Sequence, residues 1–272
     1  MEITTLVENL TYLQGTKGEH GLSFLIEVGG ERILFDTGQS DLLTRNARAL
    51  GVDLAAIDAV VISHGHYDHT GGFSAFFEIN DHAPVYLKPG CFDEKFSTKG
   101  GQHEIGIDRD VKDQLQDRFI SVNNQIEVAP GLWIVPEIGQ YYSFEQASPV
   151  MRVRHENQLV PDPFEDELFM VYHHSGGSTV FAGCAHRGIG NICRTAMDVT
   201  GHEKVKMVLG GTHLKGASQG RISKTVDAFR EMDVEQFALG HCTGLPAFFA
   251  FSQAFGEKVR YAHVGTRFFP YD

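Results

Sequence analysis

Three histidines and one aspartate fall within six residues of the chain: His64, His66, Asp68 and His69. Imidazole nitrogen is a good ligand for zinc, iron or manganese, and carboxylate oxygen suits the harder of these ions. Gly65 permits a tight backbone path, so one loop can direct all four side chains inward. A single histidine would more commonly be a satisfied core or surface residue, but this spacing favours a metal site.

Further polar side chains follow apolar stretches later in the chain, where strands would end. Cys184 and His186 come after residues 179–182, and His241 follows residues 236–239. Residues 184 and 186 would share a face if the strand continued, because side chains alternate along a strand. His213 follows residues 205–209 and is either a ligand, a general acid, a substrate contact at the cavity edge, or an ordinary loop histidine.

The elements that would position these residues are recognisable from hydrophobic spacing. Residues 22–28 and 32–36 read as strands joined at Gly29-Gly30, and a helix with Ser40 as N-cap ends at Gly51. A buried strand at residues 59–62 leads directly into His64. The second half repeats this order, with strands at 168–172, 179–182, 205–209 and 236–239, and helices striped by Ile189, Ile222 and Phe251.

Strands that feed polar loops, with helices between them, indicate an α/β fold. We expect an αβ/βα four-layer sandwich, with two β-sheets face to face and helices outside. No linker interrupts the chain, so residues 1–272 are interpreted as one domain with pseudo-halves at about 1–130 and 131–272. Residues 88–118 are the least regular segment and form the best candidate for a substrate-facing insertion.

Composition excludes several classes of function. The chain of 272 residues has a formal net charge of −12, which makes nucleic acid a poor partner. Residues 1–14 lack the features of a signal peptide, and no run of about 18 apolar residues could span a membrane. Four scattered cysteines (Cys91, Cys184, Cys193 and Cys242) fit reduced thiols, and a cytoplasmic location is expected.

The H-x-H-x-D-H pattern after a strand, preceded by Phe35-Asp36-Thr37-Gly38, resembles the metallo-β-lactamase superfamily. The resemblance implies that His64 and His66 ligate a first metal, and that Asp68 and His69 ligate a second. It also implies that Asp36 supports the metal loop from behind the ligands. His241 matches the last histidine ligand of the family, and His186 is our choice for the remaining one. Cys184 stands where many relatives have a metal-bridging aspartate, so Cys184 or His186 supplies that ligand.

The resemblance further implies an enzyme with two divalent metal ions, zinc as first choice and iron or manganese as alternatives. The expected activity is hydrolysis of an ester or phosphoester by a metal-bound hydroxide, on a small-molecule substrate that is possibly phosphorylated. Asp68 would orient the nucleophile, and His213 or a further metal-bound water would protonate the leaving group. Cations near one another or near His213 (Arg152, Arg154, His155 and Lys215) are candidate phosphate contacts, although surface cations are commoner than anion sites.

A narrower resemblance covers residues 183–192, 210–214 and 241–244. These segments are similar to the branch named 7,8-dihydropterin-6-methyl-4-(β-D-ribofuranosyl)aminobenzene 5′-phosphate synthase, which implies a pterin-related transferase as the alternative. A binding or sensing protein that retains the metal is the third class. The remaining histidines, such as His20, His82, His155 and His202, lack a motif and are interpreted as ordinary residues. Substrate and oligomeric state are not determined by the sequence.

Overall fold

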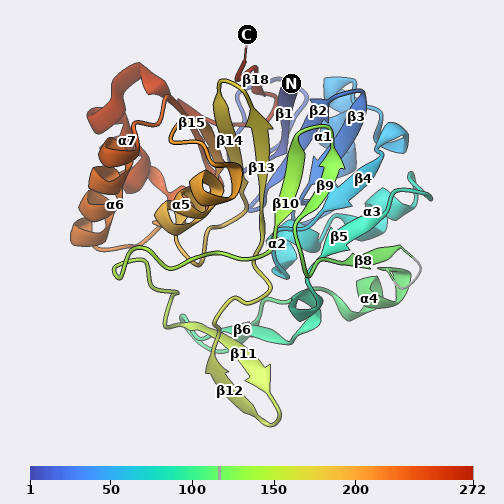
Figure 1. Ribbon diagram of the computed structural model, residues 1–272. Helices are drawn as coiled ribbons and strands as arrows, with labels where there is room; N and C mark the ends of the chain where they lie inside the picture. Colours follow the sequence, from blue (N-terminus) through green and yellow to red (C-terminus); the bar gives the residue numbers. More distant parts are fainter. Residues whose placement is uncertain (116–117, 272) are drawn as a thin grey trace.

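The computed structural model describes residues 1–115 and 118–271, in which two seven-stranded sheets pack face to face (Figure 1). The first sheet has, in spatial order, β18 (Arg267–Phe268), β1 (Glu2–Val7), β2 (Ser23–Val28), β3 (Glu31–Phe35), β4 (Ala59–Val61), β5 (Val85–Leu87) and β8 (Phe119–Ser121). The second has β17 (Val259–Tyr261), β16 (Gln236–Leu239), β15 (Val205–Gly210), β14 (Gly177–Ala182), β13 (Phe169–His174), β10 (Leu132–Val135) and β9 (Ile126–Ala129).

Helices cover the outer face of each sheet, as Figure 1 shows, so the expected αβ/βα sandwich is confirmed. The α-helices are α1 (Leu42–Leu50), α2 (Tyr67–Thr70), α3 (Phe73–Phe77), α4 (Arg109–Leu115), α5 (Ile189–Thr200), α6 (Gln219–Met232) and α7 (Leu245–Phe255). Short 3-10 turns are η1 (Leu54–Ala56), η2 (Pro89–Phe92), η3 (His241–Thr243) and η4 (Gly256–Lys258).

Three hydrophobic clusters fill the three spaces between these layers. Phe24 and Phe181 belong to the cluster between the two sheets, where both faces are apolar. Phe76 lies in the cluster that joins the first sheet to α1, α3 and α4. Phe229 and Phe251 bury the helices of the second half against their sheet. Each fully buried phenylalanine contributes about 1.5–3 kcal/mol, so these clusters hold the sheet edges that carry the site.

The elements expected from the sequence are found within one or two residues of their predicted bounds. Gly29 and Gly30 have positive φ angles of 63° and 93°, as the tight turn between β2 and β3 requires. The N-cap prediction for α1 is wrong by one residue, because Asp41 occupies that position. Ser40 donates its hydroxyl to Glu19, while its oxygen accepts the N–H of Leu42 at 3.1 Å.

A third, four-stranded sheet was not expected from the sequence. It pairs β12 (Gln158–Pro161), β11 (Met151–His155), β6 (Lys95–Ser97) and β7 (His103–Glu104) in that order, and it extends below the sandwich in Figure 1. Two of its strands belong to residues 88–118, and the other two come from a hairpin far along the chain. The segment also contacts the metal loop, since Tyr67 N–H donates to Ile105 O at 3.0 Å.

None of the helices within residues 1–115 and 118–271 is long and apolar enough to cross a membrane. The four cysteines are free and buried.

Candidate metal centre

The candidate ligands lie at one edge of the sandwich because parallel strands bring their carboxyl ends together. Strands β3 and β4 are parallel, and so are β14, β15 and β16. Asp36 follows β3, the loop of His64 follows β4, Cys184 follows β14, and His241 follows β16. Residues far apart in sequence therefore meet where the two sheets face each other.

The first group of metal-binding atoms consists of three buried histidines: His64, His66 and His186. His186 Nε2 lies 3.2 Å from His64 Nε2. The centroid of the His66 ring lies 4.5 Å from the centroid of the His64 ring and 4.8 Å from the centroid of the His186 ring. One ring nitrogen from each of the three lies within 4.8 Å of the corresponding nitrogens of the other two.

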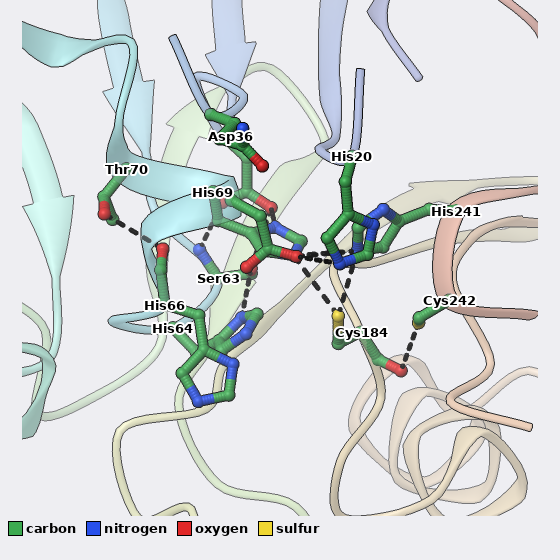
Figure 2. Close-up of polar contacts among 12 residues, drawn as sticks. His20, Asp36, Ser63, His64, His66, His69, Thr70, Cys184, His241 and Cys242 are labelled. Carbon is green, nitrogen blue, oxygen red and sulfur yellow. Dashed lines mark hydrogen bonds and ion pairs between the residues drawn. The ribbon is translucent and has the colours of Figure 1, made fainter. Parts of the chain in front are cut away.

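The second group contains four residues: Asp68, His69, Cys184 and His241. His69 Nε2 lies 3.2 Å from Cys184 Sγ and 3.2 Å from His241 Nε2. Asp68 Oδ2 lies 3.3 Å from His241 Nε2. Figure 2 shows His69, Cys184 and His241 turned toward one another, with the sulfur of Cys184 facing the two imidazoles. The structure thus places His186 in one group and Cys184 in the other.

Asp36 links the backbone and the side chains of the metal loop (Figure 2). Its Oδ1 accepts the N–H of Ser63 at 2.8 Å, and its Oδ2 accepts the Ser63 hydroxyl at 2.8 Å. The same Oδ2 lies 2.6 Å from His69 Nδ1, which directs Nε2 of that ring toward the second group. Ser63 Oγ in turn lies 2.9 Å from His64 Nδ1, so one carboxylate orients a histidine of each group.

Residues 164–167 hold His186 in place. The ring of Phe164 stacks on His186 with centroids 3.9 Å apart and an interplanar angle of 7°. Glu167 accepts the backbone N–H groups of His186 at 2.7 Å and Arg187 at 2.8 Å. Burial raises the pKa of Glu167 to about 7, and the two donated hydrogen bonds oppose that rise.

His241 is fixed by residues at the end of β1. Glu8 is fully buried and accepts the N–H of His241 at 2.5 Å, and it also accepts the hydroxyl of Tyr261 at 3.0 Å. Asn9 Oδ1 lies 3.2 Å from His241 Nδ1, on the side of the ring away from the second group. Glu8 and Asn9 were missed in the sequence, because neither stands near a recognisable motif.

Several residues around the centre have a left-handed backbone although they are not glycine. Positive φ angles occur at Asp36 (59°), Phe164 (54°), Ala185 (58°), His213 (48°) and His241 (52°). This conformation costs roughly 1–2 kcal/mol per residue, and the packing around each of these residues must offset that cost. Backbone strain of this kind concentrates at functional sites.

The electrostatics keep most of the imidazoles neutral, which is the form that binds metal. Burial lowers the pKa of His66 to about 3 and that of His213 to about 4. Burial acts in the same direction on His69, but the carboxylates of Asp36 and Asp68 outweigh it and raise that pKa to about 9. The pKa of Asp68 is held well below its ordinary value, since His69 and other imidazoles outweigh the effect of burial.

The donor set fits divalent metal ions. His66 Nε2 and His186 Nδ1 are buried and have no hydrogen-bond partner, which would be costly for polar atoms with no ligand. Three imidazoles form one group, and two imidazoles, a carboxylate and a thiol form the other. Nitrogen and sulfur donors of this kind favour zinc and iron over magnesium or calcium.

His213 and His20 lie at the border of the centre. The ring centroid of His213 is 4.2 Å from that of His186, and its backbone N–H donates to Cys242 Sγ at 3.3 Å. His20 was interpreted as an ordinary residue, yet its Nε2 lies 3.3 Å from Asp68 Oδ2 and its ring stacks on His241. No signal in the sequence distinguishes His20, because only the fold brings the segment before β2 beside the metal loop, where Leu22 N–H donates to Asp68 O.

The remaining histidines and cations named in the sequence analysis lie outside the two groups of candidate metal ligands. His82 is exposed beside Asp81, and His202 packs on His173 with ring centroids 4.5 Å apart. Arg152, Arg154 and His155 lie on β11 of the small sheet, where Arg154 pairs with Glu94. Lys215 packs against Gly244.

Residues 16–196 match the family model described as the metallo-beta-lactamase superfamily, and this match covers more than half of the chain. The chain belongs to this superfamily. The fold of this superfamily implies binding of divalent metal, and the two groups of candidate ligands fit that expectation.

Several similar proteins cover nearly the whole length of this chain. The chain is 32% identical to 7,8-dihydropterin-6-methyl-4-(beta-D-ribofuranosyl)-aminobenzene-5'-phosphate synthase of Methanocaldococcus jannaschii, over 97% of this chain and 95% of the relative. A solved structure described as a metal-dependent hydrolase of the beta-lactamase superfamily has 31% identity and a TM-score of 0.85, covering 99% and 98% of the two chains. Zn(2+)-bound PqqB from Methylobacterium extorquens has a TM-score of 0.59 at 12% identity, covers 99% and 100%, and shares the fold.

Proposed function

We propose that the protein is a binuclear metal-dependent hydrolase that cleaves an ester or phosphoester bond in a small molecule. The observation that carries this proposal is the pair of ligand groups that share the loop of residues 64–69, with Asp36 orienting one histidine of each group. A chain of 272 residues with three hydrophobic clusters does not need metal to fold, so the ions would serve chemistry.

The two groups would each hold one ion. His64, His66 and His186 would bind the first, and Asp68, His69, Cys184 and His241 would bind the second. Ions held in this way act as Lewis acids on a substrate oxygen and lower the pKa of water toward about 7. Zinc is the first choice for both ions, because one thiol and five imidazoles are softer donors than oxygen ligands.

The protein's own side chains would orient the reactants. Asp68 Oδ2 lies 3.3 Å from Nε2 of His241 and 3.3 Å from Nε2 of His20, so two imidazoles fix its position. It would hold the attacking water in line with the substrate. His213 is the imidazole that packs on His186 without belonging to either group, and we assign it contact with the leaving oxygen.

Metal stoichiometry tests this proposal. Elemental analysis of protein purified without added metal is expected to give close to two equivalents. His66→Ala and His241→Ala should each lose about one equivalent, together with hydrolysis of bis(p-nitrophenyl) phosphate or of a lactone. His82→Ala, an exposed histidine elsewhere on the first half, should retain both. Full metal content in both ligand variants, or turnover that survives chelation, would contradict the proposal.

A second candidate is a transferase related to pterin synthesis. The observation that favours it is the 32% identity to a dihydropterin-ribofuranosylaminobenzene phosphate synthase over 97% of this chain. In such a reaction the ions would stabilise a departing diphosphate. Incubation of the metal-loaded protein with a pterin diphosphate and a phosphoribosylated arylamine separates the two. Release of pyrophosphate only when the amine is present supports transfer, whereas release without it supports hydrolysis.

A further inference from the structure

Two of the four free cysteines meet beside the second group of candidate metal ligands. Cys184 follows β14 and Cys242 follows β16, so β15 lies between the strands that carry them. Cys242 Sγ lies 3.4 Å from the carbonyl oxygen of Cys184, and the two thiols are close enough to form a hydrogen bond with each other. The second sheet thus brings together two thiols that stand 58 residues apart in the sequence.

Gly211, directly after β15, leaves room for this approach. A Cβ atom at this position would lie 2.4 Å from Cys242 Sγ and 3.4 Å from Cys184 Cα, so a side chain there would occupy the space between the two cysteines. The backbone also draws the strand ends together, because Gly211 N–H donates to Gly183 O at 2.9 Å. Adjacent strands lie about 4.8 Å apart, so sulfur reaches across the intervening chain where that chain has no side chain.

The sulfur of Cys184 can serve either of two partners. Its Sγ lies 3.2 Å from His69 Nε2 and 3.3 Å from His241 Nε2, where a thiolate would ligate the second ion. Figure 2 shows this sulfur directed at the imidazoles, while the carbonyl of the same residue is directed at Cys242. Rotation about its Cα–Cβ bond moves the sulfur away from the imidazoles. The ligand form is the thiolate, and a disulfide sulfur has no such charge, so the two bonds exclude each other.

Cys242 is a thiol that the metal ligands do not use, since it belongs to neither group. A free thiol beside a second thiol is the arrangement in which an oxidised cysteine is resolved to a disulfide. The second group lies near the protein surface, because the side chain of His20 is 41% exposed and lies 3.3 Å from Asp68 Oδ2. A centre that admits an ester substrate also admits hydrogen peroxide, which is smaller.

We propose that Cys184 and Cys242 form a redox-sensitive pair, in which a disulfide removes the sulfur ligand of the second ion. The oxidant is a peroxide, which converts the Cys242 thiol to a sulfenic acid and leaves as water. The Cys184 thiol then attacks that sulfur, the S–S bond forms, and the hydroxyl group departs with the thiol proton as a second water molecule. The two sulfur atoms together lose two electrons, which the oxygen atoms of hydrogen peroxide gain, and a dithiol reverses the change.

The site of oxidation is tested by peptide mapping of the full chain under non-reducing conditions. After peroxide treatment of metal-depleted protein, we expect a peptide that links Cys184 to Cys242, the loss of two of the four free thiols, and full reversal by dithiothreitol. Cys242→Ser should abolish the linkage. Cys193→Ala is the matched control and should keep it, because Cys193 is buried among apolar residues of the second half. Absence of this linkage in the native chain, which needs no variant, would overturn the proposal.

Zinc should compete with the disulfide for the sulfur of Cys184. The linkage should form at least about tenfold more slowly in zinc-loaded protein, because a thiolate held by an ion is a weaker nucleophile. Oxidised protein should retain about one equivalent of zinc fewer than reduced protein, and dithiothreitol should restore that equivalent. Equal rates with and without zinc, or unchanged zinc content after the linkage forms, would overturn the exchange of partners.

The inference goes beyond the proposed function, although the loss of metal depends on Cys184 as a ligand. The zinc content of the reduced protein is therefore measured first. Fewer than two equivalents at that stage would count against the binuclear hydrolase, whereas the linkage in metal-depleted protein is scored without reference to turnover. Failure of the proposed function and failure of the cysteine pair are thus seen in separate measurements.

Discussion

Lys95 Nζ lies 2.9 Å from Asp166 Oδ1, and the other oxygen of that carboxylate accepts the backbone N–H of Gly65 at 2.8 Å. Gly65 stands between His64 and His66, and a Cβ atom there would lie 2.2 Å from Cys91 O. Lys95 belongs to β6 of the small sheet and also contacts Asp162 at 2.9 Å. The third sheet is thus tied to the metal loop through a fully buried ion cluster.

Asp166→Asn is expected to lower the free energy of unfolding by about 3 kcal/mol, because removing one member of a buried ion cluster leaves charge uncompensated. Urea unfolding of the metal-depleted protein measures this without a contribution from bound ions. The variant should also bind the ion held by His64, His66 and His186 more weakly, because the backbone at Gly65 is held less firmly. Asp227→Asn breaks an exposed pair with Arg230 and should cost less than about 1 kcal/mol. Equal losses in the two variants would contradict a structural role for the cluster.

The stability that Lys95 contributes should persist to high pH. Burial alone would lower the pKa of Lys95, but Asp166 and Asp162 outweigh it and raise the pKa above the ordinary value of 10.5. A raised pKa means that the stabilisation is complete below the unfolded value and declines as pH passes through the folded value. The difference in unfolding free energy between the native protein and Lys95→Met should stay constant from about pH 7 to 10 and decrease only above that range. A decrease that begins near pH 8 would show that Lys95 is not held as a charged group.

Cys184 should give the second ion a sulfur ligand. In protein loaded with cobalt, a thiolate ligand produces a charge-transfer absorption, which we expect in the native protein and not in Cys184→Ser. Cys193→Ala is the control, because Cys193 is buried on α5 among apolar residues away from the two groups. Absorption that survives in Cys184→Ser would assign the second ion to nitrogen and oxygen donors alone.

Gly183 is expected to tolerate no side chain. A Cβ atom at this position would lie 2.1 Å from Ser63 Oγ and 3.2 Å from Asp36 Oδ2, so Gly183→Ala must displace the groups that orient His64 and His69. Metal affinity and melting temperature should both fall. Gly220→Ala on α6 meets nothing closer than 4.0 Å and should raise stability by up to about 1 kcal/mol, because alanine favours the helix. Thermal melts and metal titration of the two variants check this pair, and unaltered metal binding in Gly183→Ala would refute the steric argument.

Much of the sandwich was predictable because each layer buries one face, and burial imposes a period on the sequence. The strands before His64 and His241 are continuous apolar runs, and the glycines at 29 and 30 mark a tight turn. The small sheet was not predictable, since its strands are short and incompletely buried, and the pairing of β6 with β11 joins residues more than fifty positions apart. Local spacing contains no information about such a partner.

The sequence by itself determined the family, the fold class and the loop that carries His64, His66, Asp68 and His69, because these depend on residues close together along the chain. Only the tertiary structure decided that His186 lies with the first group and Cys184 with the second. It also brought Glu8, His20 and Glu167 against the ligands. These relationships depend on where separate strand ends meet, and that position follows from packing of the two sheets and not from any local pattern.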